Sequence, residues 1–188
     1  MTVFHLLFVC TGNMYRSPIA ERLLPLHLGP AADGFRIGSA GTMARPGTPM
    51  SPDSVTMIEG LGGQASGFAT RRLSAELIGS ADLVLGLARE HREAAVQLLP
   101  TALRRCFTLE EFVRLTRERS VVNGPRAAVA QAAVARGRTS PAAPGADDIE
   151  DPDGRPLAEL RDCAARIDQA LRHVAAALTA GQDLLLSG

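Results

Sequence analysis

The chain has 188 residues, of which 46% are hydrophobic and 21% are charged, as expected for a globular protein that can bury a sizeable core. Its 20 basic residues, all of them arginine, balance 20 acidic residues, so the formal net charge is zero. This balance gives no overall field that would favour nucleic acid or an anionic membrane as a partner.

The cysteines indicate a cytoplasmic protein without a bound metal or cofactor. Cys10, Cys106 and Cys163 are too far apart for a zinc-binding motif, and their odd number does not fit a disulfide framework. Reduced thiols in a reducing cytoplasm fit this pattern. The apolar start, residues 3–9, is too short for a signal segment or a membrane span, so we expect a strand there.

Short apolar runs that alternate with amphipathic segments indicate the fold class. In chain order we expect a strand at residues 3–9, a helix from Pro18, a strand at 35–40, a helix from Ser51, a strand at 81–87, a helix at about 88–99, a strand at 104–109, a helix at 109–117 and a helix at about 156–178. Strands that alternate with helices predict an open α/β sheet, largely parallel.

A segment from about residue 114 to residue 146 interrupts this pattern. Residues 127–136 are able to form a helix, but the Gly, Pro, Ser and Ala residues around them predict a long, partly mobile connection. We therefore expect a single domain over residues 1–188 with this connection inside it.

The loop after the first strand carries the clearest chemical signal. It reads Cys10-Thr11-Gly12-Asn13-Met14-Tyr15-Arg16-Ser17 and leads into a helix. Ligands of open parallel sheets bind beyond the carboxyl ends of the strands. Backbone N–H groups and the helix dipole make such a loop an anion cradle, and the same field favours a thiolate at Cys10. The guanidinium of Arg16 can hold two phosphate oxygens at once.

Two neighbours of the cysteine have expected supporting roles. Ser17 can donate a hydrogen bond to the thiolate, and Asn13 can brace the loop from within or adopt a left-handed conformation. The alternative is that Cys10 is an inert buried thiol, which would leave Gly12, Asn13, Arg16 and Ser17 without a common purpose.

A phosphoryl-transfer enzyme of this kind also needs a proton donor for the leaving oxygen. The carboxylates of one acidic segment are the candidates: Asp147, Asp148, Glu150, Asp151 and Asp153. Asp151 precedes a proline, which biases its backbone towards an extended conformation. A solvated acidic loop with no role in catalysis is the alternative interpretation.

Several segments together resemble a known family. Residues 7–21 (LFVCTGNMYRSPIAE) resemble the opening of low-molecular-weight protein tyrosine phosphatases. The likeness continues through residues 37–42, 81–85 and 148–152 in the same order, and only the long connection departs from it. We identify the chain as a divergent bacterial member, of actinobacterial type.

The resemblance implies a single α/β domain whose four-stranded parallel sheet is flanked by helices on both faces. It implies a phosphocysteine intermediate on Cys10, with Asp151 as the general acid and then the general base. Ser39 joins Asn13 and Ser17 in the polar group that orients the loop. Phosphate is then bound by the loop residues Thr11, Gly12, Asn13, Met14, Tyr15, Arg16 and Ser17.

The chain departs from the family pattern around the expected substrate site. Tyr15 stands where many relatives carry a second cysteine, and Phe68 where a histidine is common. Asp153 and the segment 43–45 replace the two aromatic walls, which removes stacking surface for a phosphotyrosine ring. We expect Tyr15, Arg45 and Asp153 to form the wall instead.

The sequence thus predicts a metal-free phosphomonoester hydrolase whose substrate is a phosphotyrosine protein or a small phosphomonoester. A phosphatase of a small metabolite, an arsenate reductase of the same fold and a catalytically weakened phosphate-binding module remain alternatives. Arsenate reduction needs resolving cysteines near the loop, and neither Cys106 nor Cys163 is expected there. A phosphoarginine phosphatase is disfavoured because such relatives carry a small threonine at the position of Met14. No oligomeric state is predicted.

Overall fold

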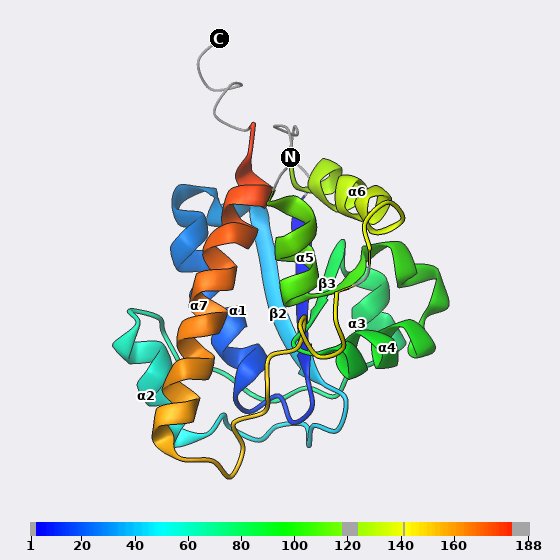
Figure 1. Cartoon of the computed structure of the whole chain (residues 1–188). Coiled ribbons are helices and arrows are strands. Elements are labelled where there is room, and N and C mark those ends of the chain that lie inside the picture. Colours follow the sequence, from blue (N-terminus) through cyan, green and yellow to red (C-terminus); the bar gives the residue numbers. More distant parts are fainter. Residues whose placement is uncertain (1–2, 118–123, 141, 182–188) are drawn as a thin grey trace.

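A computed structural model of the chain describes residues 3–117, 124–140 and 142–181 (Figure 1). Its elements are, in chain order, β1 (Phe4–Cys10), α1 (Arg16–Leu28), η1 (Gly29–Gly34), β2 (Phe35–Gly41), α2 (Pro52–Gly60), α3 (Ala75–Ser80), β3 (Leu83–Gly86), α4 (Arg89–Leu98), η2 (Pro100–Arg105), β4 (Cys106–Thr108), α5 (Leu109–Thr116), α6 (Pro125–Arg136) and α7 (Leu157–Thr179).

The strands form one parallel sheet in the order β2-β1-β3-β4, which confirms the predicted α/β class. β1 is central, with Leu7 paired to Gly38 of β2 on one side and to Val84 of β3 on the other. The strand order reverses its direction next to β1. This is the position at which ligands bind in open α/β sheets.

Alternate residues of β1 enter two separate cores, because successive strand residues point to opposite faces of the sheet. Leu6, Phe8 and Cys10 belong to the larger core, which α1, α5, α6 and α7 complete. Leu7 and Val9 belong to the smaller core, which residues of α3 and α4 complete. Helices therefore cover both faces of the sheet, as predicted, and shield both faces of β1 from solvent.

The helix of the long connection, α6, is part of the larger core. Ala128, Ala132 and Ala135 are buried there, and α6 lies against α5 and α7. Arg136 at its end donates two hydrogen bonds to Glu111 of α5, at 2.7 and 3.0 Å, and its guanidinium carbon lies 3.9 Å from the centre of the Phe107 ring. Residues 118–123 lie outside the described residues, and the partial mobility of the connection stays a prediction.

The structure also contains short elements that were not predicted. α3 has only six residues, and Ser74 caps it by accepting a hydrogen bond from the backbone N–H of Leu77. Such short helices offer too few residues for a periodic apolar pattern. None of the helices within the described residues is long and apolar enough to cross a membrane.

The loops that follow the strands gather at one end of the molecule, the lower end in Figure 1. Gly86, the last residue of β3, makes the sharp turn into α4 at this end. A Cβ atom on Gly86 would lie 2.7 Å from the backbone nitrogen of Arg92 and 3.0 Å from the carbonyl oxygen of Ala88. Only glycine allows so close a turn.

We expect Gly86→Ala to lower the free energy of unfolding by about 1–3 kcal/mol, because backbone atoms cannot move aside as a side chain can. Gly79→Ala in α3 is the matched control, since a Cβ there meets only a Leu99 methyl group at 3.8 Å. This control should be neutral or stabilise by about 0.5–1 kcal/mol. Urea unfolding of both variants measures the difference, and equal stability would contradict the assignment.

Candidate functional site

The thiol of Cys10 lies at the end of β1, against the start of α1. The residue is 3% exposed, and its Sγ lies 2.9 Å from Ser17 Oγ and accepts from the backbone N–H of Asn13 at 3.3 Å. The loop is tied to the neighbouring segment, because the N–H groups of Thr42 and Met43 donate to the carbonyls of Cys10 and Thr11, both at 2.9 Å. The start of α1 and the N–H of Asn13 thus lie beside the sulfur.

Asn13 sits at the centre of this loop and is fully buried. Its φ of 56° makes it the one residue other than glycine with a left-handed backbone among the described residues. Its Oδ1 accepts from the Arg71 backbone N–H at 2.8 Å. Its Nδ2 donates to Ser17 Oγ at 2.9 Å and to Ser39 Oγ at 2.8 Å. Both features expected of Asn13 occur together.

These contacts restrict the directions of the hydroxyl protons. Ser17 Oγ accepts from Asn13, and its own proton has two acceptors within reach: the Cys10 sulfur at 2.9 Å and the Ala40 carbonyl oxygen at 3.5 Å, of which the sulfur is the nearer. Ser39 Oγ likewise accepts from Asn13 and donates to Glu21 Oε2 at 2.6 Å. Glu21, on α1, was not predicted as a site residue, although it lies within the motif.

Arg16 joins the phosphate loop to the acidic segment. Its side chain is 3% exposed. Nη1 donates to the carbonyl oxygen of Ile149 at 3.0 Å, while Nη2 donates to Thr11 Oγ1 at 3.3 Å and to Asp151 Oδ2. Asp151 is 44% exposed, so one end of this ion pair faces solvent.

The other carboxylates of the acidic segment have different partners. Asp148 Oδ1 accepts from the backbone N–H of Arg89 at 2.7 Å and so caps the start of α4. Asp147 receives two hydrogen bonds from Arg114, at 2.7 and 3.2 Å. Glu150 lies 3.5 Å from Arg155, and Asp153 is exposed. Among these candidates, Asp151 alone contacts Arg16 in the described structure.

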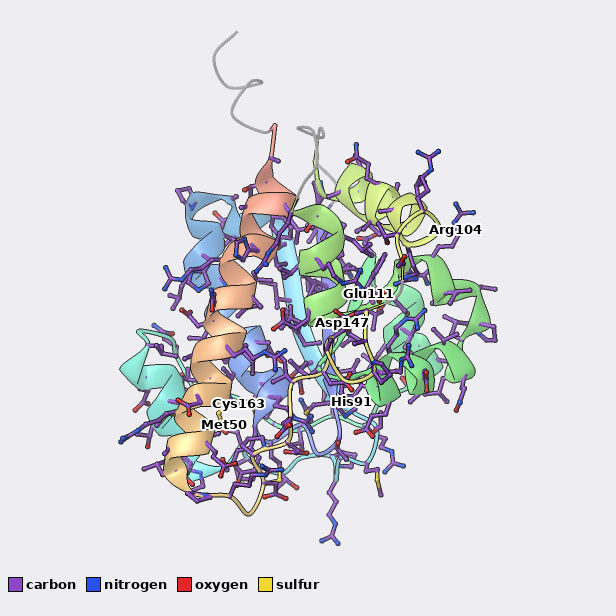
Figure 2. The ribbon with its side chains drawn as sticks, in the orientation of Figure 1. Met50, His91, Arg104, Glu111, Asp147 and Cys163 are labelled. Atoms are coloured by element: carbon purple, nitrogen blue, oxygen red, sulfur yellow. The ribbon has the colours of Figure 1, made fainter. Side chains whose placement is uncertain are left out.

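His91 belongs to the site and was not predicted. It lies in the first turn of α4, among the loops at the lower end of the view in Figure 2. The side chain is 1% exposed, and Nε2 lies 3.0 Å from Thr11 Oγ1. Burial, together with the positive charge of Arg16, lowers the pKa of His91 to about 4, so the ring is neutral at physiological pH. A single histidine in a helical pattern gives no signal of this position in sequence.

The two remaining cysteines differ in their distance from the site. Cys106 is fully buried in β4, and burial raises the pKa of its thiol to about 11. Cys163 lies on α7, as expected, but that face of α7 borders the acidic segment (Figure 2). Its Sγ lies 3.9 Å from the carbonyl oxygen of Glu150. Burial also raises the pKa of Cys163 to about 11, and the charges of Arg16 and Asp151 act on it.

The expected substrate wall is divided between exposed and packed side chains. Arg45 and Asp153 are exposed, and Met43, two residues before Arg45, is 69% exposed. Tyr15 is partly buried and packs against the larger core. Phe68 stacks with the guanidinium of Arg22, whose carbon lies 5.6 Å from the ring centre. No group of three or more metal-ligating side chains occurs in the part of the chain that the structure describes.

A family model for low molecular weight phosphotyrosine protein phosphatases matches residues 5–133. The chain belongs to this family. Its enzymes are cysteine-dependent phosphatases, and this chain is one of them. The matched residues include the whole loop from Cys10 to Ser17 and end before Asp151, so the assignment of the general acid depends on geometry.

Some relatives of this phosphatase are named as arginine phosphatases and others as tyrosine phosphatases. A protein-arginine-phosphatase of Geobacillus stearothermophilus is 34% identical over 110 residues, which cover 58% of this chain and 72% of the relative. The low molecular weight protein-tyrosine-phosphatase Etp of Escherichia coli K12 is 35% identical over 95 residues, covering 50% and 62%.

Solved structures give the same picture of the fold. The YwlE arginine phosphatase from Geobacillus stearothermophilus superposes with a TM-score of 0.72 at 26% identity, covering 98% of this chain and 97% of that one. The low molecular weight protein tyrosine phosphatase from T. tengcongensis superposes with a TM-score of 0.69 at 27% identity, covering 91% and 97%.

The neutral state of buried His91 predicts a pH-dependent stability. The folded pKa of about 4 lies below the ordinary 6.5, so the unfolded chain binds more protons between these values and stability falls as the pH is lowered. The full difference corresponds to about 3 kcal/mol. In His91→Gln this contribution is absent. Urea unfolding should therefore show a smaller decrease in the free energy of unfolding between pH 7 and pH 4 for this variant than for the wild type. Parallel curves for the two proteins would contradict it.

Proposed function

We propose that this phosphatase hydrolyses aryl phosphomonoesters, phosphotyrosine of a protein in particular, through a phosphocysteine on Cys10 with Asp151 as the general acid and base. One observation carries the proposal. The Cys10 sulfur lies at the start of α1 beside two donors, and the buried Arg16 brings Asp151 to the same loop. A nucleophile, an anion-binding cation and a proton donor therefore meet at one place.

The first step transfers the phosphoryl group to the sulfur. The phosphate dianion binds at the loop amides and at Arg16, where it replaces the ion pair with Asp151. Asp151, released from Arg16 by the phosphate, takes up a proton from solvent. The Cys10 thiolate attacks phosphorus, the bond between phosphorus and the phenolic oxygen breaks, and Asp151 gives this proton to that oxygen.

The second step regenerates the enzyme. Asp151, now a carboxylate, takes a proton from a water molecule that attacks the phosphocysteine, and the phosphorus–sulfur bond breaks to release phosphate. The departing sulfur carries a negative charge, which the Ser17 hydroxyl and the Asn13 N–H stabilise. The contacts that orient Ser17 thus act on the leaving thiolate.

One exposed apolar side chain near the site supports an aromatic leaving group. Met43 presents an exposed thioether beside the phosphate loop, and sulfur–aromatic contacts are favourable. Relatives named as tyrosine phosphatases support a phosphoprotein substrate. The free cysteines support a cytoplasmic location, and the bacterial sources of the relatives support a bacterial one.

Two other chemistries receive less support. An arsenate reductase needs resolving thiolates, but burial keeps Cys106 and Cys163 as thiols, with pKa values of about 11. A phosphoarginine substrate is suggested by the names of two relatives and of the YwlE structures, but Met14 provides a bulky apolar side chain where a small threonine is expected. A phosphorylated metabolite remains an alternative that a substrate panel decides.

The mechanism predicts distinct effects for the cysteines and the acid. Cys10→Ser should abolish hydrolysis of a phosphotyrosine peptide, whereas Cys106→Ala, a change in the smaller core, should retain it. Asp151→Asn should lower kcat by about 10²–10⁴-fold with little change in KM. The loss should be smaller with para-nitrophenyl phosphate, whose leaving group needs less protonation. Steady-state kinetics without added metal measure these effects, and activity in Cys10→Ser would overturn the mechanism.

The rim predicts an effect confined to aromatic substrates. Met43→Ser should raise KM for a phosphotyrosine peptide by about two- to tenfold, because one sulfur–aromatic contact is lost. The KM for glycerol phosphate, which has no ring, should stay the same in this variant. If the wild-type enzyme has a higher kcat/KM for a metabolite phosphate than for the peptide, the substrate is a metabolite and the proposed phosphotyrosine substrate is wrong.

A further inference from the structure

We propose that His91 is a positioning residue, which holds the Thr11 hydroxyl so that its proton points to an oxygen of the bound phosphoryl group. The inference rests on the proposed phosphatase function and adds a side-chain donor to the amides of the phosphate loop. Thr11 is partly exposed at the mouth of the loop, while His91 lies behind it, 1% exposed.

The available donors and acceptors assign the proton of the imidazole. Arg16 only donates, so the hydrogen bond of 3.3 Å from its Nη2 occupies one acceptor site of Thr11 Oγ1. The Glu90 carboxylate lies 3.3 Å from Nε2 and favours a proton on that nitrogen. Nδ1 is buried and has no partner among the described residues. A bare acceptor there costs less than a bare donor, so Nε2 carries the proton.

The Thr11 hydroxyl then has both acceptor sites filled, one by Nε2–H of His91 and one by Arg16. Its own proton is left without an acceptor in the described structure. In the proposed complex a phosphoryl oxygen held by the loop amides supplies that acceptor. A hydroxyl fixed in this way donates without reorganising when substrate binds.

The fold supports this role for His91 from two sides. The tight turn at Gly86 brings the first turn of α4 beneath the loop, since a Cβ on Gly86 would lie 3.2 Å from the Cβ of His91. Leu87 in this turn donates its N–H to the Val9 carbonyl and accepts from the Ile149 N–H, both at 2.8 Å. The neutral ring also avoids placing a second cation beside Arg16.

The experiment uses two pairs of variants and their combination. His91→Leu removes the donor, while His91→Gln retains an amide N–H near the position of Nε2. Thr11→Val removes the hydroxyl, while Thr11→Ser retains it. His27→Leu is the control, because His27 binds Asp168 of α7 and lies outside the site. The measurements are kcat/KM for a phosphotyrosine peptide and, in the Cys10→Ser background, calorimetric binding of inorganic phosphate.

We expect His91→Leu and Thr11→Val each to lower kcat/KM and phosphate affinity by about five- to twentyfold. The double variant should have the same kcat/KM and phosphate affinity as the less active of the two single variants, because both changes remove the same interaction. His91→Gln and Thr11→Ser should each recover most of the activity that His91→Leu and Thr11→Val lose, because they retain the donor. His27→Leu, outside the site, should stay within about threefold of wild type.

Losses that multiply in the double variant, or a fully active Thr11→Val, would overturn the proposal. If His91→Leu does not fold, the Thr11 pair and His91→Gln still decide it. An inactive wild type would instead count against the proposed function, and phosphate binding by the Cys10→Ser proteins would still test the role of His91.

Discussion

The buried guanidinium of Arg16 is the constraint on which the site depends. A cation removed from water is tolerated only when acceptors and a negative charge replace the lost solvent. At Arg16 these partners come from two segments: Thr11 lies in the phosphate loop, while Ile149 and Asp151 lie in the acidic segment, 135 positions away for Asp151. The buried Arg16 therefore depends on the docked acidic segment for two of its three partners.

The acidic segment has a fixed part and a free part. Asp148 caps α4, and Ile149 is bound both to Leu87 and to Arg16, so these residues are held on either side. Asp151 follows two positions later, on the exposed side of the segment. Such a division suits the role proposed for Asp151, which is to leave Arg16 when phosphate arrives and yet stay within reach of the leaving oxygen.

The parts of this arrangement that were predictable have a local signature. The phosphate loop is marked by an apolar strand, a glycine-containing loop and a helix start, and Asp151 by the proline that follows it. His91 and Glu21 have no such signature, because their importance comes from which residue they meet after folding. The position of Cys163 also has no local signature. The apolar periodicity predicts α7, but only the packed structure shows that the face with Cys163 borders the acidic segment.

The same reasoning separates Arg16 from the other arginines of a chain that has no lysine. Arg136 is partly buried and pairs with Glu111, whose side chain is 12% exposed and is also held by the cap of α5. That partner cannot leave without breaking the helix start, so the pair is structural. Arg16 is more deeply buried, but its charged partner is 44% exposed and is replaceable by another anion. A buried cation with a replaceable partner suits the anion-binding role proposed for Arg16, because a substrate phosphate can take over the role of Asp151 without leaving the charge unpaired.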